Sequence, residues 1–293
     1  MKEKVIIGLE HIKGKGILSS NMDSNPTEAE IARQTLERYS GSSVAEFRSN
    51  LILTNFPRYV EYFAKSRNVS VVKGSMFEVA HCPKDDVTIL DFKIGSPAAD
   101  LVVQICAHIP HIRASILLGM CGGLRRRYNV GEYLVPVASV RAEGTSEHHF
   151  PLEVPALANF LMQKAVTQVL EEEKSVHHIG ITFTTNTRFW EFDEEFINRL
   201  KKTRAQGIEM ECATLFIASY KKRFTLGALL LISDLPLNPK GIKTKESSQM
   251  IFDTYAADHV EKGIRILKVA RQMQARSVKG AYHSNIPPIE PKP

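Results

Sequence analysis

The chain has 293 residues, and its 38 Lys and Arg against 32 Asp and Glu leave a formal net charge of +6. Its 43% hydrophobic and 24% charged residues are typical of a globular protein and exclude a mostly disordered chain. No run of about 18 apolar residues occurs, so we expect no transmembrane helix and no membrane partner.

The cysteines and the first residues indicate a cytoplasmic protein. The four cysteines, Cys82, Cys106, Cys121 and Cys212, form no CxxC pair, which favours reduced thiols over disulfides or a zinc site. The N-terminal apolar stretch is too short for a signal peptide. Two histidine pairs, 108/111 and 148/149, have no evident third ligand, so we expect neither a metal nor another cofactor.

The positive charge is spread along the chain. Its densest run, residues 125–127, has no aromatic interleaving and no zinc-finger spacing, so we expect no nucleic-acid partner. Solvated helix faces explain the charge, and an anionic small substrate would also be attracted by it.

Helices and strands are expected to alternate along most of the chain. In chain order we expect a helix at 25–41, a strand at 51–54, a helix at 59–65, a strand at 87–94, a helix at 96–108, strands at 114–119 and 133–140, a helix after Pro155, strands at 179–183 and 228–232, and a helix at 249–273. This alternation predicts one α/β domain over residues 26–274, with helices on both faces of a sheet. Residues 1–25 are expected to be a flexible lead-in and residues 275–293 a flexible, proline-rich tail.

Three segments lie at the carboxyl ends of expected strands, where α/β proteins place their ligand sites. Residues 119–123 are rich in glycine, which permits close backbone approach to a ligand and is also common in purely structural turns. Glu209 and Glu211 precede an apolar helix, where carboxylates either serve the helix dipole or face a ligand. Asp234 ends an apolar strand. It is either a residue that forms the following turn or an acid that keeps its proton in a poorly solvated cleft.

In this order the segments resemble the nucleoside phosphorylase/nucleosidase superfamily, and within it the catalytic domain of the AMP nucleosidase family. The motifs that carry the resemblance are Leu53–Phe56, Gly119–Arg125, Thr184–Glu191, Glu209–Thr214, Ser233–Leu237 and Asp258–Arg265. The likeness covers roughly residues 30 to 273. Long bacterial AMP nucleosidases also carry an N-terminal regulatory domain, which we do not expect in a chain of this length.

The resemblance implies a three-layer αβα fold with a central mixed sheet, a homo-oligomer (a hexamer) and AMP as the small-molecule substrate. It implies cleavage of AMP to adenine and ribose 5-phosphate, with Asp234 as the general acid and Ser233 orienting it. Glu211 would hold the ribose hydroxyls, and Met210 would pack against the sugar. The other residues that we expect to bind substrate by this resemblance are Thr54, Asn55, Gly119, Cys121, Gly122, Thr185, Phe189, Trp190 and Glu209. The two aromatic residues among these would stack on the purine, with core packing as the alternative.

Two further expectations concern phosphate. Arg58 and Arg125 each follow a strand-end motif, so either could bind the 5′-phosphate through paired N–H donors. Phosphorylases of this fold typically carry an arginine two residues before the first glycine of the glycine segment, where this chain has Leu117. Leucine cannot pair an attacking phosphate, which favours water as the acceptor.

Two other kinds of function stay open. One is a 5′-methylthioadenosine-type nucleosidase or a purine nucleoside phosphorylase on the same fold. The other is a nucleotide-binding regulator without chemistry, although the presence of both Glu211 and Asp234 counts against it, since a pure binder needs no proton donor.

Overall fold

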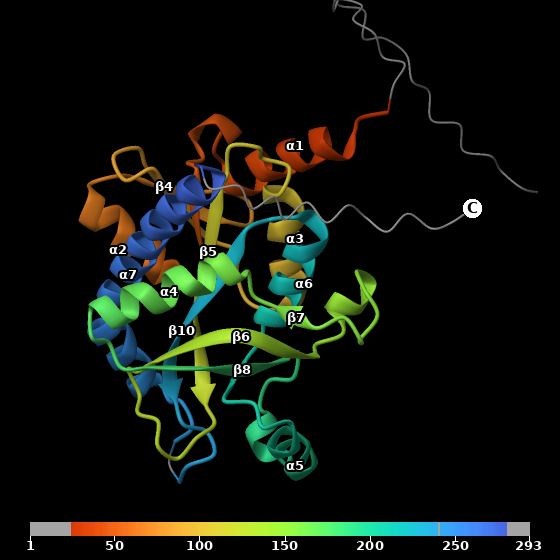
Figure 1. Cartoon of the computed structure of the whole chain (residues 1–293), viewed down its shortest axis with the longest axis vertical. Helices are drawn as coiled ribbons and strands as arrows, with labels where there is room; N and C mark the ends of the chain where they lie inside the picture. Colours follow the sequence, from red (N-terminus) through yellow and green to blue (C-terminus); the bar gives the residue numbers. More distant parts are fainter. Residues whose placement is uncertain (1–24, 240, 280–293) are drawn as a thin grey trace, which may run out of the picture.

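The computed structural model describes residues 25–239 and 241–279. A ten-stranded mixed sheet forms its centre (Figure 1). The strands are β1 (Asn50–Thr54), β2 (Val71–Lys73), β3 (Glu78–Cys82), β4 (Val87–Asp91), β5 (Ala114–Gly123), β6 (Tyr133–Ala142), β7 (Ala156–Leu157), β8 (His177–Thr185), β9 (Gly207–Glu209) and β10 (Leu226–Asp234). The helices are α1 (Glu28–Ser40), α2 (Pro57–Arg67), α3 (Ser96–Cys106), α4 (Phe160–Glu172), α5 (Glu194–Thr203), α6 (Cys212–Lys222) and α7 (Lys245–Lys279), with short 3₁₀ turns at Val44–Glu46, Thr145–His148 and Trp190–Phe192.

Part of the sheet closes on itself. Strand β5 is parallel to β1 on one side and to β10 on the other, and it also pairs with β9. Because β9 pairs with β8, β8 with β6, and β6 with β10, these five strands form a ring. Strands β1, β4, β3 and β2 extend the sheet outward from β5. The ends of β5, β9 and β10 therefore converge at one place.

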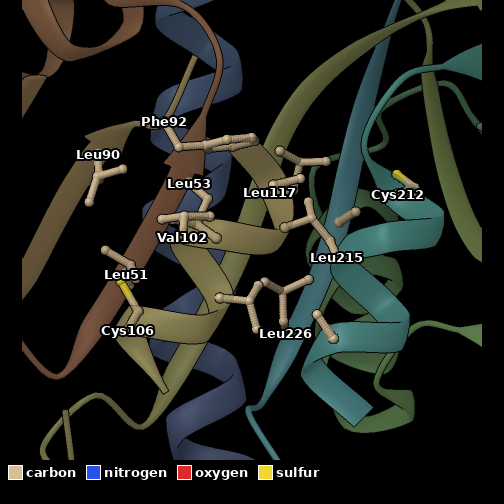
Figure 2. Close-up of a cluster of buried hydrophobic side chains, with 14 of the residues drawn as sticks. Leu51, Leu53, Leu90, Phe92, Val102, Cys106, Leu117, Cys212, Leu215 and Leu226 are labelled. Carbon is tan, nitrogen blue, oxygen red and sulfur yellow. The ribbon is translucent and has the colours of Figure 1, made fainter. Parts of the chain in front are cut away.

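Helices cover the sheet on both sides, so the expected three-layer αβα fold with a mixed sheet is confirmed. One buried cluster joins the sheet to α1, α3 and α6, and a second joins it to α2, α4 and α7. Neighbouring residues of β5 alternate between them, with Leu117 in the first cluster and Leu118 in the second, as the two-residue period of a strand requires. Figure 2 shows Leu53 and Leu117 of the sheet facing Val102 of α3 and Leu215 of α6.

The structure corrects several sequence-based boundaries. The expected glycine turn after residue 119 is strand, because β10 pairs alongside β5 as far as Gly122 and β9 pairs with its last two glycines. The expected strand 87–94 ends at Asp91, and Lys93 and Gly95 have positive φ angles of 73° and 98°. The helix expected after Pro155 begins only at Phe160, because Ala156 and Leu157 form β7.

Short strands and the chain ends account for the other differences. The sequence pattern did not predict β2, β3, β7 and β9, of which three have two or three residues. Helix α7 continues through residues 275–279, which were assigned to the tail. Except for Asn25, the expected lead-in lies outside the described residues, as do residues 280–293 of the tail. In the part of the chain that the structure describes, we find no helix both long and apolar enough to cross a membrane.

Candidate active site

A pocket of about 140 Å³ opens at the carboxyl ends of β5, β9 and β10. Ten of the predicted site residues line it: Asn55, Cys121, Gly122, Thr185, Trp190, Glu209, Met210, Glu211, Ser233 and Asp234. The structure therefore brings both predicted catalytic carboxylates, Glu211 and Asp234, to one cavity. They reach it from segments more than twenty residues apart in sequence, because β9 and β10 both pair with β5.

Glu211 is a buried carboxylate held by donors from three segments. Its Oε1 accepts hydrogen bonds from the Gly95 backbone N–H at 2.8 Å and from Asn55 Nδ2 at 3.2 Å, and its Oε2 accepts one from the Met210 N–H at 3.3 Å. Burial, followed by the charge of neighbouring Glu209, raises the pKa of Glu211 to about 7 despite these donors. Near neutral pH this residue is therefore present both as an acid and as a carboxylate.

Asn55 provides an acceptor beside this carboxylate. Its Nδ2 donates to Glu211, and its buried Oδ1 has no hydrogen-bond partner among the residues that the structure describes. A buried acceptor without a partner is unfavourable, so a ligand hydroxyl that donates to it would stabilise the site. Asn55 and Glu211 together suit a group with adjacent hydroxyls.

Both carboxylate oxygens of Glu209 accept hydrogen bonds from other residues of the protein. Its Oε2 accepts from the backbone N–H groups of Glu211 at 2.7 Å and Cys212 at 2.6 Å, at the N-terminus of α6. Its Oε1 accepts from the hydroxyls of Thr184 and Ser139. Burial raises the pKa of Glu209, and these donors oppose that shift. Glu209 thus lines the pocket, but its bonds show that it mainly holds the start of α6 and the Glu211 backbone in place.

Asp234 lies at the end of β10, where it is half-buried in the pocket wall. Ser233 Oγ donates to Asp234 Oδ1 at 2.7 Å, which leaves Oδ2 without a protein partner among the described residues. Ser233 is therefore hydrogen-bonded to the carboxyl group, and its part in orienting a proton donor stays a prediction. The second oxygen is available for a proton that faces the ligand.

Lys243 was not predicted, and it lies in the loop that follows β10. Its Nζ is 3.5 Å from Met120 Sδ, and no carboxylate lies within ion-pair distance of it among the described residues. Burial lowers the pKa of Lys243, and the charge of Asp234 opposes this shift. An ammonium group thus stands near the predicted acid, with no local sequence motif that could have indicated it.

The two aromatic residues predicted to bind substrate, Phe189 and Trp190, lie in different environments. Trp190 lines the pocket but is only 4% exposed and packs in a cluster with Phe183 and Ile208. Phe189 has a φ of 62°, is 73% exposed and does not line the pocket. Phe189 therefore lies outside the pocket wall, and Trp190 combines a core position with a place in the wall. Stacking of these rings on a purine stays a prediction.

Four other predicted residues also lie outside the pocket wall. The guanidinium of Arg125 donates to the carbonyl oxygens of Leu124, Ala205 and Arg204, so it joins the segment after β5 to the end of α5 and lies outside the pocket wall. Arg58 is on α2 and bonds to Gln249 and Asp253 of α7. The other two are Thr54, whose hydroxyl donates to the Leu118 carbonyl, and Gly119, inside β5.

Eight lining residues were not predicted: Phe56, Ile94, Met120, Thr187, Arg188, Glu191, Ile208 and Lys243. Most of them are neighbours of predicted residues inside the same motifs, so the motifs themselves contained the available signal. Arg188 pairs with Glu191 at 3.6 Å and is the second cation of the wall.

The thiol beside the carboxylates is unreactive, and the described residues form no metal site. Burial, together with Asp234 and Glu209, raises the pKa of the Cys121 thiol well above its usual value, so it stays protonated and unreactive. Across residues 25–239 and 241–279, no three His, Cys, Asp or Glu side chains are grouped as metal ligands. This wall therefore offers two carboxyl groups, Glu211 and Asp234, and the amide oxygen of Asn55 around one cavity.

Comparison with known proteins agrees with this geometry. The phosphorylase superfamily model matches residues 50–270, so the chain belongs to that superfamily. The chain is 25% identical over 296 residues to the AMP nucleosidase of Escherichia coli K12, covering 86% of the chain and 60% of that protein's length. It is 32% identical over 142 residues to the uridine phosphorylase of Klebsiella aerogenes, covering 44% of the chain and 56% of that protein. Among solved structures, the AMP nucleosidase from Bacteroides thetaiotaomicron superposes with a TM-score of 0.75 at 33% identity, covering 85% of this chain and all of that one.

Proposed function

We propose that the protein hydrolyses the N-glycosidic bond of AMP to adenine and ribose 5-phosphate. The observation that carries the proposal is that Glu211 and Asp234 line one pocket, the first beside the acceptor Asn55 and the second beside Ser233. A glycosidic bond to a purine needs a proton for the leaving base and negative charge near the sugar carbon. These two carboxyl groups supply both.

The reaction follows from the placement of these groups. Asp234 donates its proton to the purine ring as the C1′–N9 bond breaks, and the bonding electron pair leaves with the base. Glu211 and Asn55 accept hydrogen bonds from the ribose hydroxyls, and the Glu211 carboxylate stabilises the positive charge that develops on the sugar ring. Water then adds to C1′ and loses a proton. The ammonium of Lys243 stabilises the Asp234 carboxylate that remains after proton donation.

Water is favoured over phosphate as the acceptor by the position of Leu117. This side chain is 1% exposed and packs in the core cluster below the pocket, so it offers nothing to an attacking phosphate. Arg113 lies at the other end of β5 and does not line the pocket. A phosphate dianion next to apolar side chains without paired donors would be strongly disfavoured.

The preference for AMP over other nucleosides and nucleotides is supported by the likeness to AMP nucleosidases. The cytoplasmic location and the homo-oligomeric state stay predictions of the sequence. The decisive experiment measures base release from AMP, adenosine, guanosine and uridine in phosphate-free buffer, and it identifies the sugar product. Release of adenine from AMP with ribose 5-phosphate is expected, and Asp253→Asn, a matched exposed position, should behave as the wild type.

Strict dependence on inorganic phosphate, with a sugar 1-phosphate as product, would instead assign the chain to the phosphorylases of its superfamily. Nucleotide binding without base release would indicate a non-catalytic binder.

A further inference from the structure

A second, larger cavity lies at the opposite end of the sheet. It is a groove of about 820 Å³ at the amino ends of β5 and β10, formed by the α3–β5 loop, the α6–β10 turn, the start of α4 and the end of α7. In Figure 1 the arrowheads of β5 and β10 point the same way. The groove residues Arg113 and Thr225 directly precede these two strands, whereas the pocket residues Gly122 and Asp234 lie at their carboxyl ends. Arg113, in the groove, precedes Gly122, in the pocket, by nine residues of extended chain, which is about 30 Å.

The charge of the groove is positive. Arg113, Lys222, Arg223 and Arg271 line it, and among residues 25–239 and 241–279 no Asp or Glu does. Lys222 pairs with Glu28 of α1, but the three arginines have no ion pair with a carboxylate in the part of the chain that the structure describes. Three arginines therefore line one cavity without a compensating carboxylate from the described residues.

Helix termini explain only some of these cations. Lys222 lies in the last turn of α6 and Arg223 is its C-cap, where positive charge stabilises the helix dipole. Arg113 instead precedes β5, and Arg271 lies two turns before the end of α7. These two have no helix terminus to serve, yet they face the same cavity.

Hydrogen bonds connect two of the elements that form the groove, α7 and the residue before β5. Arg271 donates to Gln274 Oε1 at 2.8 Å, and Gln274 Nε2 donates to the Arg113 carbonyl at 3.2 Å, so α7 is joined to the strand that begins at residue 114. The rest of the wall is apolar and includes Ile109, Leu161 and Phe224. Guanidinium forks match phosphate oxygens in two-point hydrogen bonds, and the volume suits a drug-sized or nucleotide-sized molecule.

We propose that this groove binds a small organic phosphate, with the phosphate dianion on Arg113, Arg223 and Arg271 and the apolar body against Phe224 and Leu161. A dianion is favoured over a monocarboxylate because three uncompensated positive charges meet in the groove. The site is separate from the catalytic pocket, and the proposal does not depend on the reaction that occurs there.

The test measures binding of 1-naphthyl phosphate to the full chain by fluorescence, with 1-naphthol and inorganic phosphate as the two partial ligands. Binding is expected to be at least tenfold tighter for 1-naphthyl phosphate than for either partial ligand, and unchanged by Asp234→Asn or by saturating adenine. The double variant Arg223→Ala/Arg271→Ala should weaken it at least tenfold. Arg126→Ala, an exposed arginine outside the groove, should leave it unchanged.

Denaturation midpoints establish that each variant is folded. If the double variant does not fold, Arg223→Glu, at an exposed turn position, is used in its place. Equal weakening by Arg126→Ala would mean diffuse attraction to the net charge and would overturn the proposal. Equally tight binding of 1-naphthol would show a merely apolar groove, and competition by adenine would place the ligand in the catalytic pocket; either result would also refute it. Binding of single-stranded RNA through the same arginines, with 1-naphthyl phosphate inert, would replace the small ligand by a nucleic acid.

Discussion

Replacing Glu211 by Gln should make the protein more stable in alkaline conditions than the wild type while it disables the proposed reaction. The pKa of Glu211 is raised in the folded protein from 4.5 to about 7, chiefly by burial and then by Glu209. Because the folded state holds this proton more tightly, the associated stability is fully present below pH 4.5 and is lost as the pH rises through 7. Gln cannot ionise, so the variant does not lose this stability as the pH rises.

The magnitude follows from the two pKa values. Between pH 5 and pH 8 the ionisation of Glu211 should lower the unfolding free energy of the wild type by about 2–3 kcal/mol. The Gln oxygen can still accept from Asn55 and Gly95, so the pH-independent change is confined mainly to the weaker bond from the Met210 N–H. Removing the charge also eases the ionisation of Glu209, which acts in the same direction.

The assay is urea unfolding of the wild type and Glu211→Gln at pH 5 and pH 8, at one protein concentration. From pH 5 to pH 8 the unfolding free energy of the variant relative to the wild type should rise by about 2–3 kcal/mol. Glu171→Gln, an exposed glutamate on α4, should follow the wild type at both values. If the difference is the same at pH 5 and pH 8, Glu211 is not held as a buried, destabilised carboxylate, and the reasoning fails.

Four other outcomes test the site. Asp234→Asn keeps the shape but not the transferable proton, so steady-state kinetics should show AMP turnover reduced by about 10²- to 10⁴-fold with little change in binding, and near-normal turnover would make Asp234 structural. Lys243→Met should lower turnover of AMP and adenosine by similar factors, because Lys243 lines the same pocket as Asp234; a loss with AMP alone would assign Lys243 to the phosphate. Gly95→Ala should lower stability by about 1–2 kcal/mol in urea unfolding and raise KM, since φ is 98° there and its N–H holds Glu211; an unchanged KM would separate the two effects. Below about pH 7, kcat/KM should fall about tenfold per pH unit as Glu211 takes up its proton, and a flat profile would exclude ionised Glu211 from substrate binding.

Sequence reasoning was most successful where the signal is local. Apolar runs bounded by glycine, proline or charge indicated β1, β5, β6, β8, β10 and the longer helices, since strands and helices with a buried face need a periodic apolar pattern. It failed for β7 and β9, which have two and three residues and depend on the partner strand for their existence. It also placed a turn at Gly119, because glycine usually ends a strand unless neighbours on both sides continue the ladder, as β10 and β9 do here.

Glu211 and Asp234 show what the sequence by itself determined. The order of the motifs predicted by resemblance that both residues belong to one site, and the apolar pattern indicated the strand that ends at Asp234. Their meeting at one cavity depends on β9, a strand of three residues that the apolar pattern did not indicate and that pairs antiparallel with the end of β5. The motif around Ser233 also indicated the hydroxyl that is bonded to Asp234.

Only the tertiary structure decided what the long cationic side chains do. Arg125 and Arg58 follow the right strand ends, but one turns to three carbonyl groups near α5 and the other to α7. Lys243, from a loop without a motif, reaches the pocket instead. A guanidinium or ammonium group is separated from its backbone by several rotatable bonds, so its partner is chosen by whichever carbonyl, carboxylate or cavity the packed elements bring within reach. Sequence spacing does not contain that information, whereas a short Asp, Ser or Asn side chain stays where its strand end places it.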